Sequence, residues 1–315
     1  MINHTQSIKA AIKAKAGELG FDFCGIARAD SLDTFGDILD NWTGRGFHGK
    51  MSYMERNREK RLDPRLLAED AKSVIALALN YYPGQIRPAG SGIRISRYAY
   101  GRDYHYIIRE KLKRLADHLE TIAGTHKFRA FTDSAPVLER TWAQKAGLGA
   151  CGKNSCLIIP RRGSFYFLGE IITSIELEPD TPFEKDMCGS CTRCIDACPT
   201  GAIKSPGTID ANRCISYLTI ELKESIPEGL RDKCGPWVFG CDVCQEVCPH
   251  NRHSSPHREK ELNALPYASE WNDSDWVSLK RENYINSFIK TGSPIARVSF
   301  EKLADNISCA VSGSL

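Results

Sequence analysis

Apolar positions along the chain divide it into helices and strands before any motif is considered. In residues 5–20, apolar side chains recur at helical spacing on one side, and Gly20 follows as a stop signal. Residues 73–82 instead form one continuous apolar run, whose length favours a buried strand. The same criteria predict helices at 32–42, 107–122 and 134–146, strands at 21–27, 127–133, 157–160 and 165–176, and glycine-rich loops at 84–95 and 147–155.

Asp133 ends one predicted strand directly before a predicted helix. Ser134 is the expected N-cap of that helix, with Pro136 near its first turn and Gly147 as its stop. Functional groups often lie where a strand ends beside a helix N-terminus. The pattern alone leaves two interpretations of Asp133, a functional carboxylate or a residue that only caps the helix.

Cysteines form two runs in the second half of the chain. Each run ends in Cys-Pro and has the close spacing of bacterial two-cluster ferredoxins. In that arrangement, three neighbouring thiolates bind one [4Fe-4S] cluster and the fourth cysteine binds the other cluster. The runs contain Cys188, Cys191, Cys194 and Cys198, then Cys241, Cys244 and Cys248, with Cys214 between them.

This exchange of ligands assigns the cysteines to two clusters. The first set is Cys188, Cys191, Cys194 and Cys248, and the second is Cys198, Cys214, Cys241 and Cys244. Cys214 is preferred to Cys234 as the last ligand, because Gly-Pro after Cys234 indicates a turn. Paired Cys-x-x-Cys also occurs in zinc sites, but two runs that end in Cys-Pro favour iron–sulfur clusters. The remaining cysteines, expected to be small buried residues or spare thiols, are Cys24, Cys151, Cys156, Cys234 and Cys309.

Composition and element order predict a globular protein in three parts. The chain has 315 residues, of which 42% are hydrophobic and 26% charged, and its net charge is +3. This charge predicts no strong general affinity for nucleic acid, although a local basic face remains open. We expect an α/β region at 1–179, where strands alternate with helices, a two-cluster ferredoxin-like module at 180–253, and a polar, helical tail at 254–315.

No apolar run is long enough to cross a bilayer, and the N-terminus shows no signal-peptide pattern. We therefore expect a cytoplasmic protein without membrane contact. Residues 98–106 are dense in aromatic side chains, with arginines interleaved. Such a segment can stack on bases or on a flat macrocycle, or it can form a helix entry packed on the core.

Several motifs in combination resemble the epoxyqueuosine reductase family. The most specific is residues 132–140, TDSAPVLER, and the others are 51–56 (MSYMER), 96–105 (SRYAYGRDYH), 146–149 (AGLG) and 152–154 (GKN), followed by the cysteine runs. The resemblance extends from about residue 5 to about residue 300. It implies an α+β, nitroreductase-like sandwich that binds cobalamin, two [4Fe-4S] clusters, and reduction of epoxyqueuosine to queuosine at the wobble base of tRNA.

The resemblance also implies roles for individual residues. Asp133 matches the position of the general acid that protonates the leaving oxygen. A carboxyl group buried beside an apolar macrocycle can keep its proton near neutral pH, because desolvation disfavours the anion. The sequence has no histidine motif for a lower cobalt ligand, so a cobalamin without a protein histidine is expected. Candidates for cobalamin contacts are Arg56, Lys153, Asn154, Ser216 and Asp242.

Many members of that family continue into a C-terminal helical repeat that helps to bind tRNA, whereas this sequence stops at Leu315. Contacts to tRNA are then expected from other basic residues, which can equally be solvated surface charges. The expected partners are a tRNA with epoxyqueuosine in its anticodon and an unidentified low-potential electron donor, and the protein is expected to be a monomer. The basic candidates are Lys223, Arg231, Lys233, Lys280, Arg281 and Lys290.

Two other functions remain open at this point. A reductive dehalogenase would share cobalamin and clusters, but such enzymes usually carry an export signal. A two-cluster electron carrier would need little beyond the cysteine module, which leaves the large N-terminal region unexplained.

Overall fold

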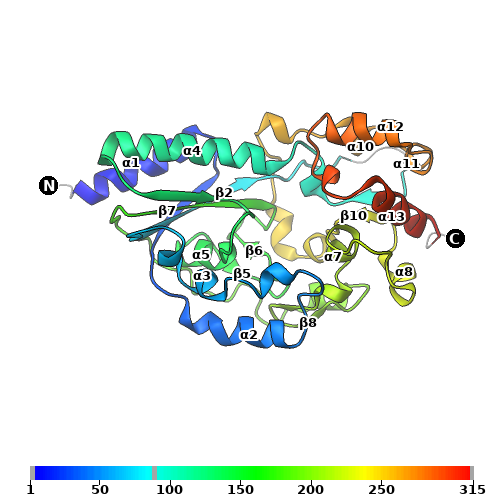
Figure 1. Cartoon of the computed structure of the whole chain (residues 1–315), viewed down its shortest axis with the longest axis horizontal. Helices are drawn as coiled ribbons and strands as arrows, with labels where there is room; N and C mark the ends of the chain where they lie inside the picture. Colours follow the sequence, from blue (N-terminus) through cyan, green and yellow to red (C-terminus); the bar gives the residue numbers. More distant parts are fainter. Residues whose placement is uncertain (1–3, 87–90, 313–315) are drawn as a thin grey trace.

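A computed structural model describes residues 4–86 and 91–312 of the chain. Its central feature is an antiparallel sheet with the strand order β1-β2-β7-β4 (Figure 1). Because these strands pair only antiparallel, the α/β description of this region is wrong and the region is α+β. The strands are β1 (Phe23–Arg28), β2 (Ser73–Asn80), β7 (Tyr166–Thr173) and β4 (Phe128–Phe131).

The sheet is covered on both faces, which explains why β2 is buried along its whole length and has a continuous apolar sequence. Helices α1 (His4–Glu18) and α4 (Tyr104–Ala123) lie on one face, and α5 (Glu139–Lys145) lies on the other (Figure 1). On the α5 side, α3 (Arg58–Leu62) lies close to α5, and α2 (Gly36–Gly44) lies farther from the sheet (Figure 1). The predicted helices at 5–20, 32–42 and 107–122 and the predicted strands are thus confirmed within a few residues.

The segment after Asp133 is not the predicted helix start. Residues 134–138 are not helical, and α5 begins at Glu139, with Leu138 as an N-cap that makes no side-chain hydrogen bond. The prediction that Ser134 caps the helix is therefore wrong. Pro136 disfavours helical backbone at Ala135, and the N–H of Val137 bonds to the Ala135 carbonyl instead of entering a helix. The predicted stop is confirmed, since Gly147 follows α5 with φ of +80°.

The predicted loops contain short strands. Within 84–95, β3 (Arg94–Ile95) is a strand, and residues 87–90 lie outside the described residues. Within 147–155, β5 (Ala150–Cys151) pairs with β6 (Leu157–Ile158). Single helical turns connect many of the elements, namely η1 (Asp33–Phe35), η2 (Ser52–Met54), η3 (Pro64–Leu66), η4 (Arg97–Ala99), η5 (Ala211–Arg213), η6 (Pro249–His253), η7 (Lys260–Leu262), η8 (Ile285–Ile289) and η9 (Pro294–Arg297).

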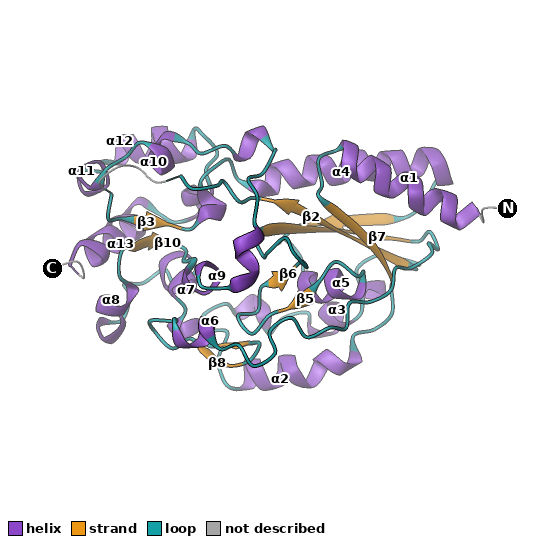
Figure 2. Ribbon diagram, turned by 180° about the vertical axis from the view of Figure 1, so that it is seen from behind, coloured by secondary structure: helices purple, strands orange, loops and turns teal. Residues whose placement is uncertain are grey.

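The cysteine-rich region is built from very short elements around loops. Helices α6 (Arg193–Asp196) and α9 (Val243–Glu246), one in each cysteine run, lie side by side (Figure 2). The other elements are β8 (Ile203–Ser205), β9 (Thr208–Ile209), α7 (Ile215–Ile220), α8 (Glu228–Cys234) and β10 (Trp237–Phe239).

The C-terminal tail is helical, as expected, but it packs into the rest of the protein. Its helices are α10 (Pro266–Ser269), α11 (Asp273–Val277), α12 (Arg281–Tyr284) and α13 (Phe300–Ser312). β10 pairs with β3, and α13 packs against β10 and α8. Phe239, Tyr267, Trp276, Phe288 and Leu303 share one apolar cluster there. In the described ranges, no helix is long and apolar enough to span a membrane.

A buried amide ties α13 to this cluster, and its removal tests that packing. Asn306 is 0% exposed, and its Nδ2 donates to the carbonyls of Thr219 at 2.8 Å and Val238 at 3.0 Å. Asn306→Ala leaves both buried carbonyls without this donor, so we expect the unfolding free energy to fall by about 2 kcal/mol. Urea unfolding of anaerobic protein measures this loss. Asn283→Ala, at an exposed position of α12, is the control, and equal losses in the two variants would contradict the packing role.

Candidate active site

A cavity of about 800 Å³ opens at the end of the sheet where β2 ends and β7 begins. Asp133, which follows β4, forms part of its wall, and Gln245 of α9 forms another part. Gln245 directly follows the cysteine at 244, so the cavity extends from the sheet to the cysteine-rich region. Much of the remaining wall is aromatic or aliphatic, from Tyr53, Tyr81, Tyr104, Tyr166, Phe167, Pro136, Val137, Leu138, Leu157 and Leu168.

The Asp133 carboxylate is accessible from this cavity, and its side chain is 61% exposed in the chain alone. The hydroxyl of Tyr104 donates to Asp133 Oδ2 at 2.8 Å. Tyr104 itself is fixed by stacking on Phe167, with ring centroids 4.0 Å apart. Burial, followed by the nearby Asp133 carboxylate, raises the pKa of Tyr104 well above its usual range, so Tyr104 stays a hydrogen-bond donor at neutral pH.

Three further polar groups lie beside Asp133. His105 Nε2 is 3.8 Å from Asp133 Oδ2, and His105 Nδ1 is 2.7 Å from Asp103 Oδ1. Arg297 Nη2 lies 2.8 Å from His105 Nε2, and Arg297 also lines the cavity. Although burial opposes it, hydrogen bonds from His105 lower the pKa of Asp103. This network places a charged guanidinium and an imidazole at the same wall as the Asp133 carboxylate.

Sequence motifs did not connect these groups to Asp133, although Tyr104 and His105 lie in the aromatic segment 98–106. Tyr104, His105 and Arg297 lie far from residue 133 in the chain, and no spacing connects them to it. Arg61 was also missed, since the motif at 51–56 pointed to Arg56 instead. The structure places Arg61 in the cavity wall, 7% exposed, with its buried Nε lacking a partner among the described residues, whereas Arg56 is exposed in the adjacent turn.

Cysteines of the two runs lie near one another in the folded chain. Cys248 interacts electrostatically with Cys188 and Cys191 of the other run. Cys214 interacts in the same way with Cys198 and Cys244. No three of the described His, Cys, Asp and Glu side chains converge closely enough to hold a single metal ion. A cubane cluster is larger than one ion and holds its four thiolates around it.

Cys234, the alternative to Cys214, has a different partner. It is 1% exposed and lies beside Cys309 of α13, which is 2% exposed. Cys156, another of the remaining cysteines, lines the cavity and lies beside Cys244. The structure therefore associates Cys234 with the packing of α13, and Cys156 with both the cavity and a proposed cluster ligand.

The other residues suggested for cobalamin contact lie near the cysteines and outside the cavity wall. Lys153 Nζ donates to the carbonyls of Gly189 at 2.7 Å and Cys191 at 3.0 Å. Asn154 Nδ2 donates to the Cys244 carbonyl at 3.3 Å, and the backbone of Ser216 hydrogen-bonds to Cys214. These contacts support the cluster-binding loops.

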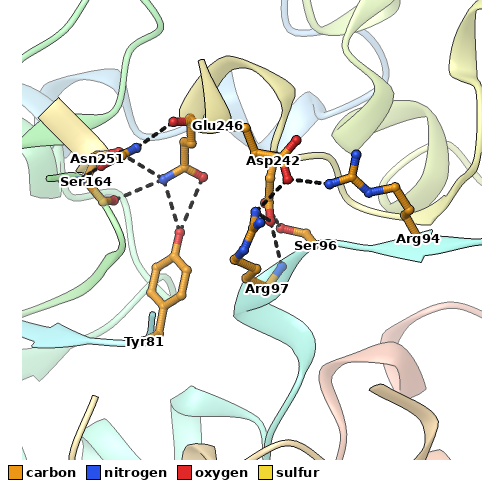
Figure 3. Close-up of polar contacts among 9 residues, drawn as sticks. Tyr81, Arg94, Ser96, Arg97, Ser164, Asp242, Glu246 and Asn251 are labelled. Atoms are coloured by element: carbon orange, nitrogen blue, oxygen red, sulfur yellow. Dashed lines mark hydrogen bonds and ion pairs between the residues drawn. The ribbon is translucent and has the colours of Figure 1, made fainter. Parts of the chain in front are cut away.

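Asp242 has a similar supporting position. Its side chain is 1% exposed and accepts hydrogen bonds from the Ser96 hydroxyl, from the N–H of Arg97 at 2.9 Å and from Arg97 Nη1 at 3.0 Å (Figure 3). Arg97 and Arg94 also pair with Glu246 in the same figure. Asp242 lies between Cys241 and Cys244 in the sequence, so these bonds attach the second cysteine run to the segment after β3.

The basic residues suggested for tRNA contact fall into two groups, arginines that form ion pairs and lysines that are exposed. Arg231 pairs with Asp305 at 3.5 Å, and Arg281 pairs with Glu301. The lysines are exposed, at Lys223, Lys233, Lys280 and Lys290.

Comparison with known proteins connects this geometry to a family. Residues 187–251 match the model of the 4Fe-4S double cluster binding domain, and residues 61–134 match the model of epoxyqueuosine reductase QueG. An epoxyqueuosine reductase of Cyclobacterium marinum is 48% identical over 305 residues, which cover 96% of each chain. The chain belongs to the epoxyqueuosine reductase family.

Solved structures of the family have the same fold. A crystal structure of an epoxyqueuosine reductase with an epoxyqueuosine-modified tRNA-Tyr stem loop is 34% identical, with a TM-score of 0.89 over 98% of this chain and 82% of the other. The Bacillus subtilis family member, at 33% identity and a TM-score of 0.86 over the same shares of the two chains, was captured with its catalytic aspartate loop swung out of the active site. A Pseudomonas aeruginosa member is 39% identical over 95% of this chain and 83% of its own length.

The cysteine assignment can be tested by iron content. Cys214→Ser removes a proposed ligand of the second cluster, so we expect about half of the iron to be lost from anaerobically reconstituted protein. Cys234→Ser is the matched control, because Cys234 contacts Cys309 and should leave the iron content unchanged. Colorimetric iron analysis with visible and electron paramagnetic resonance spectra measures both. Full iron in Cys214→Ser together with loss in Cys234→Ser would reverse the assignment.

Proposed function

We propose that this chain reduces epoxyqueuosine in tRNA to queuosine, with Asp133 as the proton donor. The observation that carries the proposal is the composition of one cavity wall. Asp133 at the end of β4 and Gln245 beside Cys244 line the same cavity, so a proton donor and the cluster-binding region meet at one site. The family relationship supplies the substrate, and the tRNA complex of a relative supports tRNA as the partner.

The reaction requires a proton donor of this kind. Reduction of an epoxide to an alkene consumes two electrons and two protons, breaks both carbon–oxygen bonds and releases the oxygen as water. Without protonation the oxygen is a poor leaving group, so a general acid within reach of it lowers the barrier to reduction. Asp133 is suited to this role, because its carboxylate is accessible from the cavity and is oriented by the Tyr104 hydroxyl.

The cavity walls fit cobalamin by their chemistry. Aromatic faces such as those of Tyr81 and Phe167 can pack against a macrocycle, and the unpartnered Nε of Arg61 can donate to a peripheral amide. Cobalamin, when bound, would supply the two-electron reduction, and two [4Fe-4S] clusters would supply its single electrons. The loops between the clusters and the cavity would then be held in place by residues that do not line the cavity, namely Lys153, Asn154, Ser216 and Asp242.

We assign the parts of the chain as follows. Residues 1–179 form the catalytic domain, whose antiparallel sheet between helices supports the nitroreductase-like description, and residues 180–253 form the cluster module. Residues 254–315 stabilise this module through the apolar side-chain cluster that β3, β10 and α13 share. We further propose a monomer that receives electrons from a low-potential donor, and exposed lysines such as Lys280 and Lys290 as phosphate contacts. Since the substrate is a tRNA, the proposed place of action is the cytoplasm.

A mass measurement on the nucleoside tests the proposed reaction. Anaerobically reconstituted protein is incubated with cobalamin, a low-potential reductant and tRNA that contains epoxyqueuosine, and the tRNA is then digested. We expect the modified nucleoside to lose the mass of one oxygen. Failure of brown, cobalamin-bound protein to convert it would refute the proposed substrate, and failure to bind cobalamin would favour the electron carrier.

Substitution of Asp133 tests its role. Asp133→Asn keeps the shape and the acceptor for Tyr104 but removes the proton, so we expect a rate loss of about 10² to 10⁴-fold. Cobalamin absorbance and iron content serve as controls and should match those of the wild type. Unchanged conversion by Asp133→Asn would remove Asp133 from the proposed mechanism.

A further inference from the structure

The backbone of Asp133 is held in a conformation that needs support. Its φ is +46°, in the left-handed region that costs most residues free energy, although aspartate tolerates it better than most. Its N–H donates to Glu139 Oε1 at 2.5 Å, while its side chain accepts from Tyr104. Asp133 is thus fixed at two points, since its main-chain N–H is hydrogen-bonded to Glu139 and its carboxylate is hydrogen-bonded to Tyr104.

Glu139 can make this contact because α5 starts late. The helix begins at Glu139 itself, and residues 134–138 form the loop that returns from Asp133. From the first turn of α5, the side chain of Glu139 reaches back six residues to the N–H at the end of the β4 segment. No cation forms an ion pair with Glu139 among the described residues, and the neighbouring Arg140 donates to the Ser155 carbonyl instead.

Behind Glu139 lies a second carboxyl group, that of Glu170 in the middle of β7. Glu170 is 0% exposed and lies on the same face of β7 as Leu168 and Ile172, which belong to the apolar cluster on the α5 side of the sheet. Neither of its oxygens has a hydrogen bond of standard geometry in the described part of the chain, although its carboxyl group lies beside that of Glu139. Two adjacent carboxylates without an ion-paired cation cannot both be charged at low cost in this apolar surrounding.

We propose that Glu139 is a positioning residue for Asp133. We further propose that buried Glu170 shares one proton with Glu139, so that the two carboxyl groups together carry a single negative charge. The singly charged pair offers the Asp133 N–H an acceptor without placing two charges in the core. This inference rests on the proposed function, because only a proton donor at Asp133 gives its positioning a catalytic consequence.

The charge state of the pair depends on pH in a defined direction. Burial raises the pKa of Glu139, and burial together with the charge of Glu139 raises the pKa of Glu170. The pair therefore keeps its proton at neutral pH and loses it as the pH rises through its raised pKa. Two adjacent buried charges then repel each other, so the hydrogen bond that Glu139 accepts from the Asp133 N–H weakens on the alkaline side. The charged and titratable groups that face the pair and Asp133 are Arg140, Tyr53, Tyr104, His105 and Arg297.

Hydrogen exchange tests the positioning without substrate or turnover. We compare the wild type, Glu139→Ala and Glu139→Gln by deuterium uptake in a peptide that covers the Asp133 amide. Glu139→Ala removes the acceptor, so we expect exchange at this amide to become about tenfold faster. Glu139→Gln keeps an acceptor oxygen and should retain the protection, as should the control Glu110→Ala on the exposed side of α4. Wild-type protection in Glu139→Ala would overturn the proposal.

Activity measurements then connect position to catalysis. Single-turnover reduction by Glu139→Ala should slow by about 10²-fold with substrate affinity unchanged, because a small displacement of a catalytic group has an effect of this size. Glu139→Gln should stay within a few-fold of the wild type. A rate loss in Glu139→Ala without faster exchange would also overturn the proposal. If the wild type itself reduces no epoxyqueuosine, the proposed function fails, and the exchange result still decides whether Glu139 holds Asp133.

The role of Glu170 is tested by pH. Glu170→Gln imitates the protonated side chain and has no charge to gain, so its Asp133 amide should stay protected at alkaline pH where the wild type loses protection. The alkaline limb of the single-turnover rate should move to higher pH in the same variant. Identical pH profiles of exchange in the wild type and Glu170→Gln would refute the role of Glu170.

Discussion

The arrangement of this protein depends most on the hydrogen bonds that the buried carboxylate of Asp242 accepts. Asp242 lies between two proposed cluster ligands and is bonded to Ser96 and Arg97, which follow β3. Because β3 also pairs with β10, the second cysteine run is attached to the same segment by backbone and by charge. Loss of one partner of a buried pair costs about 3–5 kcal/mol, so this attachment resists displacement of the run from the cavity.

The cavity receives its two chemical functions from opposite sides of this attachment. Asp133 and its neighbours come from the sheet domain, whereas Gln245 and Cys156 connect the cavity to the second cysteine set. In the proposed reaction, the groups for proton supply and for electron supply are thus separate in sequence and adjacent in space. Burial of the carboxyl pair behind Asp133 is costly, and Glu139 of this pair accepts the hydrogen bond from the Asp133 N–H.

Much of this organisation could be predicted from local sequence. The continuous apolar run of β2, the amphipathic α1 and the spacing of the cysteines each follow from the chain itself, since each needs only residues close in sequence. The predicted cap at Ser134 is wrong, because Pro136 and the left-handed Asp133 delay the helix to Glu139. The predicted α/β region is wrong because periodicity does not reveal strand direction.

The sequence by itself determined the ligand chemistry, the position of Asp133 at a strand end and the order of helices and strands. Only the tertiary structure decided what surrounds Asp133. Tyr104, Arg297, Glu170 and Gln245 come from four separate elements, and they meet because the sheet, the cysteine loops and the tail pack against one another. No spacing rule encodes such a meeting, since burial and charge act between surfaces that become neighbours only in the folded chain.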